Sequence, residues 1–577
     1  MTTRILTTPA EPPRRSAPDD PRGDSGRSGP RHAAPTGSGQ GGSLAGLATM
    51  IRFMLRRDRW RLPLWVLGLA ALTAYFANAI GTVMDDEALA SMTVFARNPI
   101  MGLISGPGYG FDEITLPRFI TGVYGVFLML GAAMMNITSI SRHTRIEEQT
   151  GRAELIRANV TGRDTQLIAA LVVAVLMNAA LSVLMTLAFR YSAAEPEPLA
   201  SVVLFSLGVA AVGCVFAAVT AVTSQFSAFA RAGSGIAGAV LAAAFVIRGL
   251  GDMSAVQDGD LEWLTWLSPL GWAQQTAPFV LDRWWPLLLH LGLFAVLVPI
   301  AVRLQSTRDL AAGILAERLG REHAPGSLST PLGLALRLQR SSLVWWSIGV
   351  FTMGVVFGSF TGAMADSAAG MPPEIVDIMG GAAGIVDGYI GYMAMYFALI
   401  VTAYAVLAIL GLRSEEQGVR TEPVLATAVS RSSWLLSWTC VTALGVLWLM
   451  LLAGLGDGLG AAVSTGDWEV FGPSVLGHTA QTASVWVFLA LALALYGFAP
   501  RLMALTWIVF VCSAVLTLFG QMLQVDEEVL DTSVFRHVGQ YPAQDLSAEA
   551  VLVLIGVAAV LVCLGVLGFR RRNLITA

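Results

Sequence analysis

Lysine is missing from this chain of 577 residues, and all 36 of its basic residues are arginines. A Walker A loop requires a lysine that reaches the β- and γ-phosphates of a bound nucleotide. The sequence therefore excludes a nucleotide-hydrolysing site of this kind. Any work driven by ATP would have to be done on another polypeptide.

Charged residues and cysteines are also scarce. Charged residues make up 13% of the chain, whereas a soluble domain carries about a quarter. The arginines lie in short polar stretches and form no basic face, so nucleic acid is excluded as a partner. The four cysteines, Cys214, Cys440, Cys512 and Cys563, lie in separate apolar runs without CxxC spacing. We therefore expect no disulfides, metal sites or cofactors in this chain.

Hydrophobic residues, in contrast, make up 55% of the chain. A membrane-spanning helix needs about 20 predominantly apolar residues. Twelve stretches meet this requirement, near residues 62–84, 118–141, 166–189, 199–222, 235–251, 284–303, 344–366, 389–412, 433–453, 476–498, 502–523 and 548–569. We predict an all-α integral membrane protein with 12 transmembrane helices, arranged as two homologous six-helix halves.

The predicted domain organisation has four parts. They are a disordered cytoplasmic tail (1–43), a first six-helix half (44–303), a cytoplasmic linker (304–330) and a second six-helix half (331–577). The tail is rich in Pro, Gly, Ser and Arg and contains no apolar block, a composition that does not support a packed core.

An amphipathic segment precedes each half. Apolar residues recur at helical spacing from Leu44 to Leu55, and Leu332–Leu343 repeats the pattern. We predict an interfacial helix at both places, although a simple basic flank of the first spanning helix would give a similar pattern. In the linker, Arg308–His323 is predicted to form a charged cytoplasmic helix.

Arginines are distributed unevenly between the two sets of loops. With the N-terminus inside and the tail left aside, 24 arginines lie on the cytoplasmic side and 6 on or near the other side. Loops that flank spanning helices on the cytoplasmic side carry an excess of basic residues. The distribution therefore predicts that both termini are cytoplasmic.

Two of the cytoplasmic segments have related sequences, one after the second helix of each half. Residues 147–163 read EEQTGRAELIRANVTGR, and residues 415–431 read EEQGVRTEPVLATAVSR. An ungapped alignment gives seven identities in 17 positions: Glu147/Glu415, Glu148/Glu416, Gln149/Gln417, Arg152/Arg420, Glu154/Glu422, Ala158/Ala426 and Arg163/Arg431. Unrelated segments of this length would agree at about one position, so we infer an internal duplication.

Each repeated segment has a glutamate four residues before an arginine, Glu148 with Arg152 and Glu416 with Arg420. Pairs in this order stabilise a short helix by roughly 0.2–0.5 kcal/mol. We therefore predict a charged surface helix in each half. The alternative is that the charges only solvate a loop and fix the topology, but a docking task common to both halves explains the retained polar residues better.

The pattern of two glutamates, a Gly/Arg pair, a third glutamate and a closing arginine resembles the coupling helix of ABC-2 type exporter permeases. Further similarities are Asn98-Pro99 with Gly106-Pro107, Ser268-Pro269-Leu270-Gly271-Trp272, and Arg308-Asp309 with Gly313 and Arg318. Over residues 44–572 the chain is similar to actinobacterial antibiotic and multidrug exporter permeases in which both halves are fused in one polypeptide. Such permeases lie in the bacterial inner membrane.

The resemblance implies that both segments dock onto separate ABC ATPase subunits, which form a homodimer and bind ATP and Mg²⁺. The residues implied in coupling are Glu147, Glu148, Gln149, Gly151, Arg152, Glu154, Arg163, Glu415, Glu416, Gln417, Arg420, Glu422 and Arg431. The implied function is export of a hydrophobic or amphipathic compound from the cytoplasm or the inner leaflet. The second segment departs from the pattern at Gly418-Val419 and Pro423, which predicts looser docking there.

Two other functions stay open. A proton-coupled multidrug antiporter needs carboxylates or histidines inside the membrane, and we identify only His290 there, a position where a single histidine more often serves helix packing. A multispanning membrane glycosyltransferase keeps acidic residues in its first outer loop. Asp85-Asp86-Glu87 lies in that loop, but an acidic cluster alone is more often a solvated surface.

Two further features concern the substrate path. The segment Leu261–Phe279 is apolar but too short to span with its central Pro269, so we predict a re-entrant or interfacial cap. An ordinary surface loop is the alternative. Asn136 and Asn178 lie within predicted spans, where they would line a path between the halves or form hydrogen bonds between helices.

Overall fold

The computed structural model describes residues 43–83, 99–157, 162–309, 312–315, 320, 322–367, 384–519 and 526–573. Every regular element in these ranges is a helix, and 12 helical stretches are long and apolar enough to cross a membrane. Each of the 12 predicted spans coincides with one of them. The chain is therefore an all-α, multi-pass membrane protein. The predicted tail lies outside the described residues, apart from Ser43.

The first six spans run Arg61–Ile80, Leu116–Gln149, Thr165–Arg190, Leu199–Thr223, Ala230–Val256 and Pro286–Ser306. They include the long helices α2 (Arg61–Val83), α6 (Gly125–Ser141), α9 (Thr165–Arg190), α10 (Leu199–Thr223), α11 (Ala230–Val256) and α13 (Pro286–Ser306). Shorter helices around them are α1 (Leu47–Arg57), α4 (Pro99–Ile104), α5 (Leu116–Phe119), α7 (Glu147–Gln149), α8 (Arg152–Arg157), η3 (Glu262–Leu267) and α12 (Pro269–Gln274).

The last six spans run Pro331–Gly362, Ile385–Gln417, Arg431–Thr465, Phe471–Phe498, Pro500–Leu518 and Ala548–Arg571. Their helices are α14 (Pro331–Gly358), α15 (Phe360–Ser367), α17 (Ile385–Gln417), α19 (Arg431–Thr465), α20 (Phe471–Ala480), α21 (Thr482–Phe498), α22 (Ala504–Phe519) and α24 (Ala548–Arg571). The short helices α18 (Thr421–Leu425) and α23 (Glu527–Leu530) lie at their ends.

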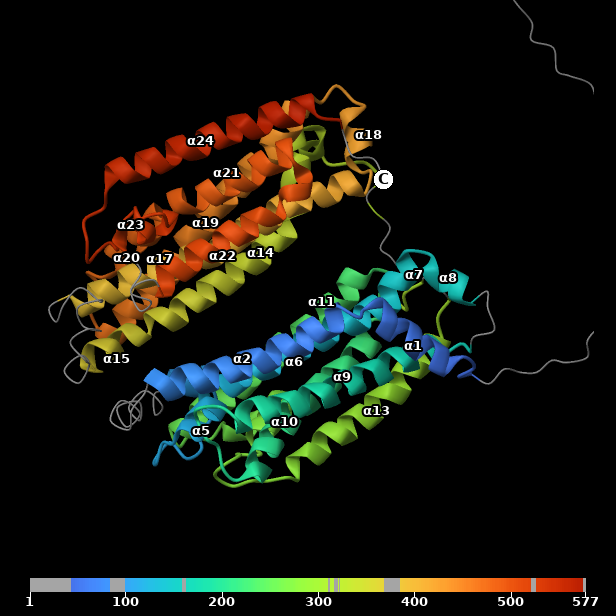
Figure 1. Ribbon diagram of the computed structural model, residues 1–577. Coiled ribbons are helices and arrows are strands. Elements are labelled where there is room, and N and C mark those ends of the chain that lie inside the picture. Colours follow the sequence, from blue (N-terminus) through green and yellow to red (C-terminus); the bar gives the residue numbers. More distant parts are fainter. Residues whose placement is uncertain are drawn as a thin grey trace, which may run out of the picture.

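Two large clusters of buried apolar side chains form the cores. One draws on the helices from α1 to α13, between Met50 and Ala301, and the other on the helices from α14 to α24, between Ala335 and Phe569. Figure 1 shows the two corresponding bundles, coloured blue to green and yellow to red. The bundles meet where Met101 and Ile104 of α4 pack against a cluster around Phe360 and Tyr389.

The structure contains a separate amphipathic helix at only one of the two places where we predicted an interfacial helix. In the first half, α1 is a separate amphipathic helix, and Asp58 follows it before α2 begins. In the second half, Leu332–Leu343 is instead the first part of the continuous helix α14. A helix that continues straight into the span cannot lie flat in the interface, so the prediction of a second interfacial helix is wrong.

The predicted linker helix Arg308–His323 is also wrong for the part of it that the structure describes. The backbone amides of Ile314 and Leu315 donate to the carbonyl oxygens of Gln225 and Phe226, both at 3.0 Å. These bonds hold this part of the linker against the end of α10. The charged composition of the segment predicted a surface helix. Its backbone amides instead form hydrogen bonds with residues outside the segment, so they are not free for a helix.

Polar residues inside the first bundle join helices. Asn178 of α9 donates from Nδ2 to Oδ1 of Asn136 on α6 at 2.9 Å, and the reciprocal bond measures 3.1 Å. Both side chains are buried. The two amides therefore satisfy each other between helices and do not line a substrate path.

Candidate coupling site

The two repeated segments fold in the same way. In the first, α7 ends at Gln149, Gly151 has a φ of 71°, and α8 follows. In the second, α17 ends at Gln417, Val419 has a φ of 59°, and α18 follows. Gly151 and Val419 are equivalent in the ungapped alignment. The same helix, left-handed turn and helix thus occur in both halves, although only one copy has the glycine that this turn favours.

The equivalent glutamates Glu148 and Glu416 each form a two-point ion pair with an arginine. Arg308 donates from Nη2 to Glu148 Oε1 at 2.7 Å and from Nη1 to Oε2 at 2.9 Å. Arg572 donates from Nη1 to Glu416 Oε1 and from Nη2 to Oε2, both at 2.6 Å. We call these two pairs the clasps. Bidentate Arg–carboxylate pairs of this type combine strong hydrogen bonds with a fixed geometry.

The arginines of both clasps lie at equivalent positions, just after the sixth span of their half. Arg308 lies just beyond α13, which ends at Ser306, and Arg572 directly follows the last residue of α24. Each clasp therefore joins the C-terminal end of the second span to the end of the sixth. This correspondence is a second sign of internal duplication, and it does not depend on the sequence identities.

The arginines that close the repeated segments contact the same helix ends. Arg163 donates to the carbonyl oxygen of Ser306 at 2.6 Å, and Arg431 donates to that of Arg572 at 2.8 Å. The last carbonyls of a helix have no partner within it, and a cation there is favourable. Each segment is thus fastened to the sixth span of its half at both its ends.

Further contacts complete the first clasp. Arg145, which is buried, donates to Glu148 Oε2 at 2.8 Å and to the carbonyl oxygen of Ala312 at 3.0 Å. Glu147, one residue before, forms an ion pair of 2.6 Å with Arg57 of α1. The hydrogen bond to Glu147 raises the pKa of Arg57, so this guanidinium stays charged. The interfacial helix is thereby tied to the same segment.

In the second clasp an aromatic residue takes the place of the additional arginine. Tyr496 of α21 donates its hydroxyl to Glu416 Oε2 at 2.6 Å. The guanidinium of Arg572 lies 4.9 Å from the ring centre of Tyr496 and 4.9 Å from that of Phe569. A cation above aromatic faces is stabilised electrostatically. The two clasps are therefore equivalent in geometry but differ in their supporting groups.

The predicted pairs between Glu148 and Arg152 and between Glu416 and Arg420 are wrong. The left-handed turn interrupts the helix between each acid and its arginine, so the spacing of a continuous helix is lost. Arg420 instead pairs with Glu415, from Nε to Oε2 at 2.8 Å and from Nη2 to Oε1 at 2.9 Å.

The clasps also correct the interpretation of the glutamates as surface groups. Glu147 and Glu416 are 3% and 5% exposed, and the side chain of Glu148 is 6% exposed. Acids so deeply buried cannot present their charge to a partner protein. The exposed residues of the predicted set are Gln149, Gly151, Arg152, Glu154, Arg163, Gln417, Arg420 and Glu422.

The exposed members form equivalent surfaces in the two halves. Gln149, Arg152 and Glu154 correspond to Gln417, Arg420 and Glu422 in the alignment, and all six are exposed. Between them, the equivalent residues Ala153 and Thr421 are both buried, at 0% and 1% exposure. Figure 1 shows α7, α8 and α18 at the same end of the molecule, where the C-terminus also lies. We call this the coupling end.

At the opposite end, the predicted cap Leu261–Phe279 packs into the first bundle. Ser268, Leu270 and Thr276 in its centre are fully or almost fully buried. Pro269 accepts a hydrogen bond of 2.9 Å through its carbonyl oxygen from Nε2 of His290. The centre of this stretch is therefore not an ordinary surface loop, and His290 packs against it.

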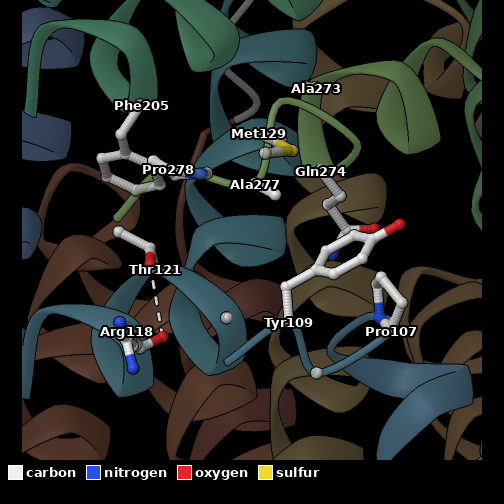
Figure 2. A pocket seen from close by; sticks show the side chains of 12 residues that line it. Pro107, Tyr109, Arg118, Thr121, Met129, Phe205, Ala273, Gln274, Ala277 and Pro278 are labelled. Carbon is white, nitrogen blue, oxygen red and sulfur yellow. Dashed lines mark hydrogen bonds between the residues drawn. The ribbon is translucent and has the colours of Figure 1, made fainter. Parts of the chain in front are cut away.

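A small cavity of about 30 Å³ lies under this cap. Figure 2 shows Tyr109, Gln274 and Thr121 around it. The hydroxyl of Tyr109 donates to Oε1 of Gln275 at 2.5 Å, and the amide of Gln274 donates to the carbonyl oxygen of Ser105. The space fits about one water molecule, so a drug-sized compound does not bind there in this conformation.

A larger cavity of about 270 Å³ lies nearer the coupling end, between the bundles. Arg231 of α11 contributes from the first half, and Trp346, Tyr404 and Trp438 contribute from the second. Ligand sites commonly begin at about 300 Å³ and combine aromatic walls with a few polar groups. This cavity has the composition and almost the size of such a site.

Comparison with known proteins identifies the family. The model of a family described as "Multidrug efflux system permease Rv1217c, C-terminal domain" matches residues 47–303 and 328–570. The chain belongs to the Rv1217c family of multidrug efflux permeases. The multidrug efflux system permease protein Rv1217c of Mycobacterium tuberculosis (strain ATCC 25618 / H37Rv) is 35% identical over 549 residues, which cover 94% of this chain and 97% of that protein.

The family match spans both bundles and omits the stretch between residues 303 and 328. Both clasp glutamates lie inside the matched ranges, whereas Arg308 and Arg572 lie just outside them. The acidic cluster Asp85-Asp86-Glu87, on which the glycosyltransferase alternative depended, lies outside the described residues.

Proposed function

We propose that this chain is the membrane permease of an ATP-driven ABC exporter, with ATP and Mg²⁺ bound by a separate homodimeric ATPase. The observation that carries the proposal is the pair of equivalent segments at the coupling end, each fastened by a clasp to its bundle. Two equivalent docks on one chain match the two equal subunits of a homodimer. The missing lysine supports a separate ATPase, because this chain cannot form a Walker A loop.

The proposed location is the bacterial inner membrane, with the coupling end and both termini in the cytoplasm. The 24 arginines on the predicted cytoplasmic side support this orientation. It would bring the exposed residues Arg152, Glu154, Arg420 and Glu422 into reach of a soluble ATPase.

The clasps suggest how force would enter the bundles. An ATPase that pushes on the exposed faces of α8 and α18 would move Glu148 and Glu416, which are held on their arginines. Because those arginines follow α13 and α24, the second and sixth spans of each half would move together. Stiff, bidentate contacts transmit a displacement that a flexible loop would absorb.

The proposed cargo is a hydrophobic or amphipathic compound, bound between the halves. The cavity with Trp346, Tyr404 and Trp438 supports this placement, since aromatic side chains accept varied apolar shapes. Arg231, which lines it, would bind polar groups of an amphipathic molecule.

Purification of the chain from its native membrane tests the proposal. We expect a P-loop ATPase to copurify with two copies for each copy of the chain. Arg152→Glu combined with Glu422→Arg should weaken this association. Arg52→Glu makes the same charge change as Arg152→Glu at an exposed position of α1, and this control should retain the ATPase. If the variant with both charge reversals retains the ATPase as well as the control does, docking at these segments is contradicted.

A proton-coupled multidrug antiporter is the second candidate. It is favoured by Asp457 and His478, which are both 0% exposed inside the second bundle. Sequence reasoning missed Asp457 because it ended the predicted span at residue 453, whereas α19 continues to Thr465. Proteoliposomes containing only this chain distinguish the two candidates: an antiporter would export the compound in response to a pH gradient, and the proposed permease would not.

A further inference from the structure

The two bundles each bury an aspartate, and the two environments differ. Asp252 of α11 lies 3.1 Å from Nη1 of Arg248 and accepts a hydrogen bond of 2.7 Å from Thr265. Asp457 of α19 accepts one hydrogen bond, of 2.8 Å, from the hydroxyl of Ser474 on α20. Its Oδ1 is buried without a hydrogen-bond partner in the described part of the chain. Only the first carboxylate therefore has a counter-charge.

Glycines bring the neighbouring helices close to Asp457. A Cβ added to Gly358 of α14 would overlap the carbonyl oxygen of Asp457, and one added to Gly354 would come within 2.9 Å of its amide nitrogen. On the opposite side of α19, a Cβ at Gly458 would meet Ser474 Cβ at 3.3 Å. Because Asp457 is also fully buried, this packing leaves no layer of water beside the carboxylate.

Few titratable groups face Asp457. His478 of α20 donates from Nδ1 to the carbonyl oxygen of Ser474 at 2.9 Å. Its buried Nε2 is then an acceptor that has no hydrogen-bond partner among the described residues. Tyr389 of α17 donates its hydroxyl to the carbonyl oxygen of Phe357 at 2.8 Å. At this contact α14 presents Gly354 and Gly358, which bear no side chain. None of these groups supplies a positive charge.

An ionised carboxylate in such a place is unfavourable by several kcal/mol, because neither water nor a cation compensates for its burial. A protonated carboxyl group avoids this penalty. The hydrogen bond from Ser474 is then retained at Oδ2, and the acid proton resides on Oδ1.

We propose that Asp457 is a proton-binding site of the second bundle, loaded while α14, α19 and α20 are packed together. When these helices separate and water enters, the O–H bond at Oδ1 breaks and the proton passes to water, leaving a solvated carboxylate. The step needs no other reactant. It goes beyond the proposed export function, because the site belongs to the permease whatever drives transport.

Infrared spectroscopy of the full chain in lipid nanodiscs in D₂O tests whether the proton is bound. At neutral pH we expect a carbonyl band of a protonated carboxylic acid that disappears in Asp457→Asn. The matched control is Asp252→Asn, which removes the buried aspartate that Arg248 pairs with and should leave this band in place. A spectrum in which Asp457→Asn removes only an ionised carboxylate band would overturn the proposal.

Thermal unfolding of the same samples tests whether separation releases the proton. A group that is protonated when buried stabilises the fold at low pH and loses this contribution as pH rises. Wild type should therefore lose Tm relative to Asp457→Asn as pH increases, because asparagine stays neutral. A constant difference in Tm between the two chains from acidic to neutral pH would contradict proton release.

Discussion

Glu148 and Arg308 are 160 positions apart in the chain and form a bidentate ion pair at 2.7 and 2.9 Å. Glu416 and Arg572, 156 positions apart, repeat this relationship in the second half. In each half the pair connects the second span to the sixth. The repeated segments are therefore parts of the bundles themselves, and only their outer faces are available to a partner.

Breaking a clasp should destabilise its bundle. The side chains of Glu148 and Arg308 are 6% and 4% exposed, and removing one partner of a buried ion pair typically costs about 3–5 kcal/mol. We expect Glu148→Gln to lower the Tm of the purified chain markedly. The control is Arg420→Gln, whose side chain is 56% exposed, since exposed pairs contribute about 0–1 kcal/mol. Equal Tm values for both variants would argue against a structural clasp.

Valine at position 419 should make the protein less stable than glycine would at the same turn. Its φ of 59° is unfavourable for a β-branched residue, and a strained backbone of this type costs about 1–3 kcal/mol. We expect Val419→Gly to raise the Tm and Gly151→Val to lower it. Thermal unfolding of both variants measures the effects, and the account of the turn fails if they have the same sign.

The pair Asn136 and Asn178 should contribute modestly to the packing of α6 on α9. Hydrogen bonds between membrane helices are worth roughly 0.6–2 kcal/mol. We expect either single substitution by leucine to destabilise the chain, and the double variant to be less destabilised than the sum of the two. A double-mutant cycle of unfolding free energies measures this coupling. Strict additivity would mean that the two amides do not interact.

Charge reversal on the exposed faces should separate coupling from folding. Arg152→Glu and Glu422→Arg alter exposed side chains outside both clasps. We expect each to leave Tm almost unchanged and to reduce drug-stimulated ATP hydrolysis by the assembled transporter. Unchanged stimulation in the double variant would place docking elsewhere.

Apolar runs and the repeat could be interpreted from sequence because they depend on local composition and spacing. All 12 spans were predictable for this reason. The end of α19 was not, since its stretch from Gly454 to Gly460 has the composition of a loop. In the structure these glycines instead allow close contact with α14 and α20.

The clasps could not be predicted because their partners are distant in sequence. The spacing of Glu148 and Arg152 suggested a local pair, whereas the left-handed turn at Gly151 prevents it. An arginine lies shortly after the sixth span of each half, and this position was a signal for Arg308 and Arg572. This signal becomes informative only once the fold places the end of the second span beside the end of the sixth.

Transport by reconstituted vesicles tests the central claim most directly. Proteoliposomes would contain the chain alone or the chain with its copurified ATPase, and accumulation of a fluorescent drug would be followed with ATP or with a pH gradient. We predict uphill transport only when the ATPase and ATP are both present. Uphill transport by the chain alone in a pH gradient would contradict the account.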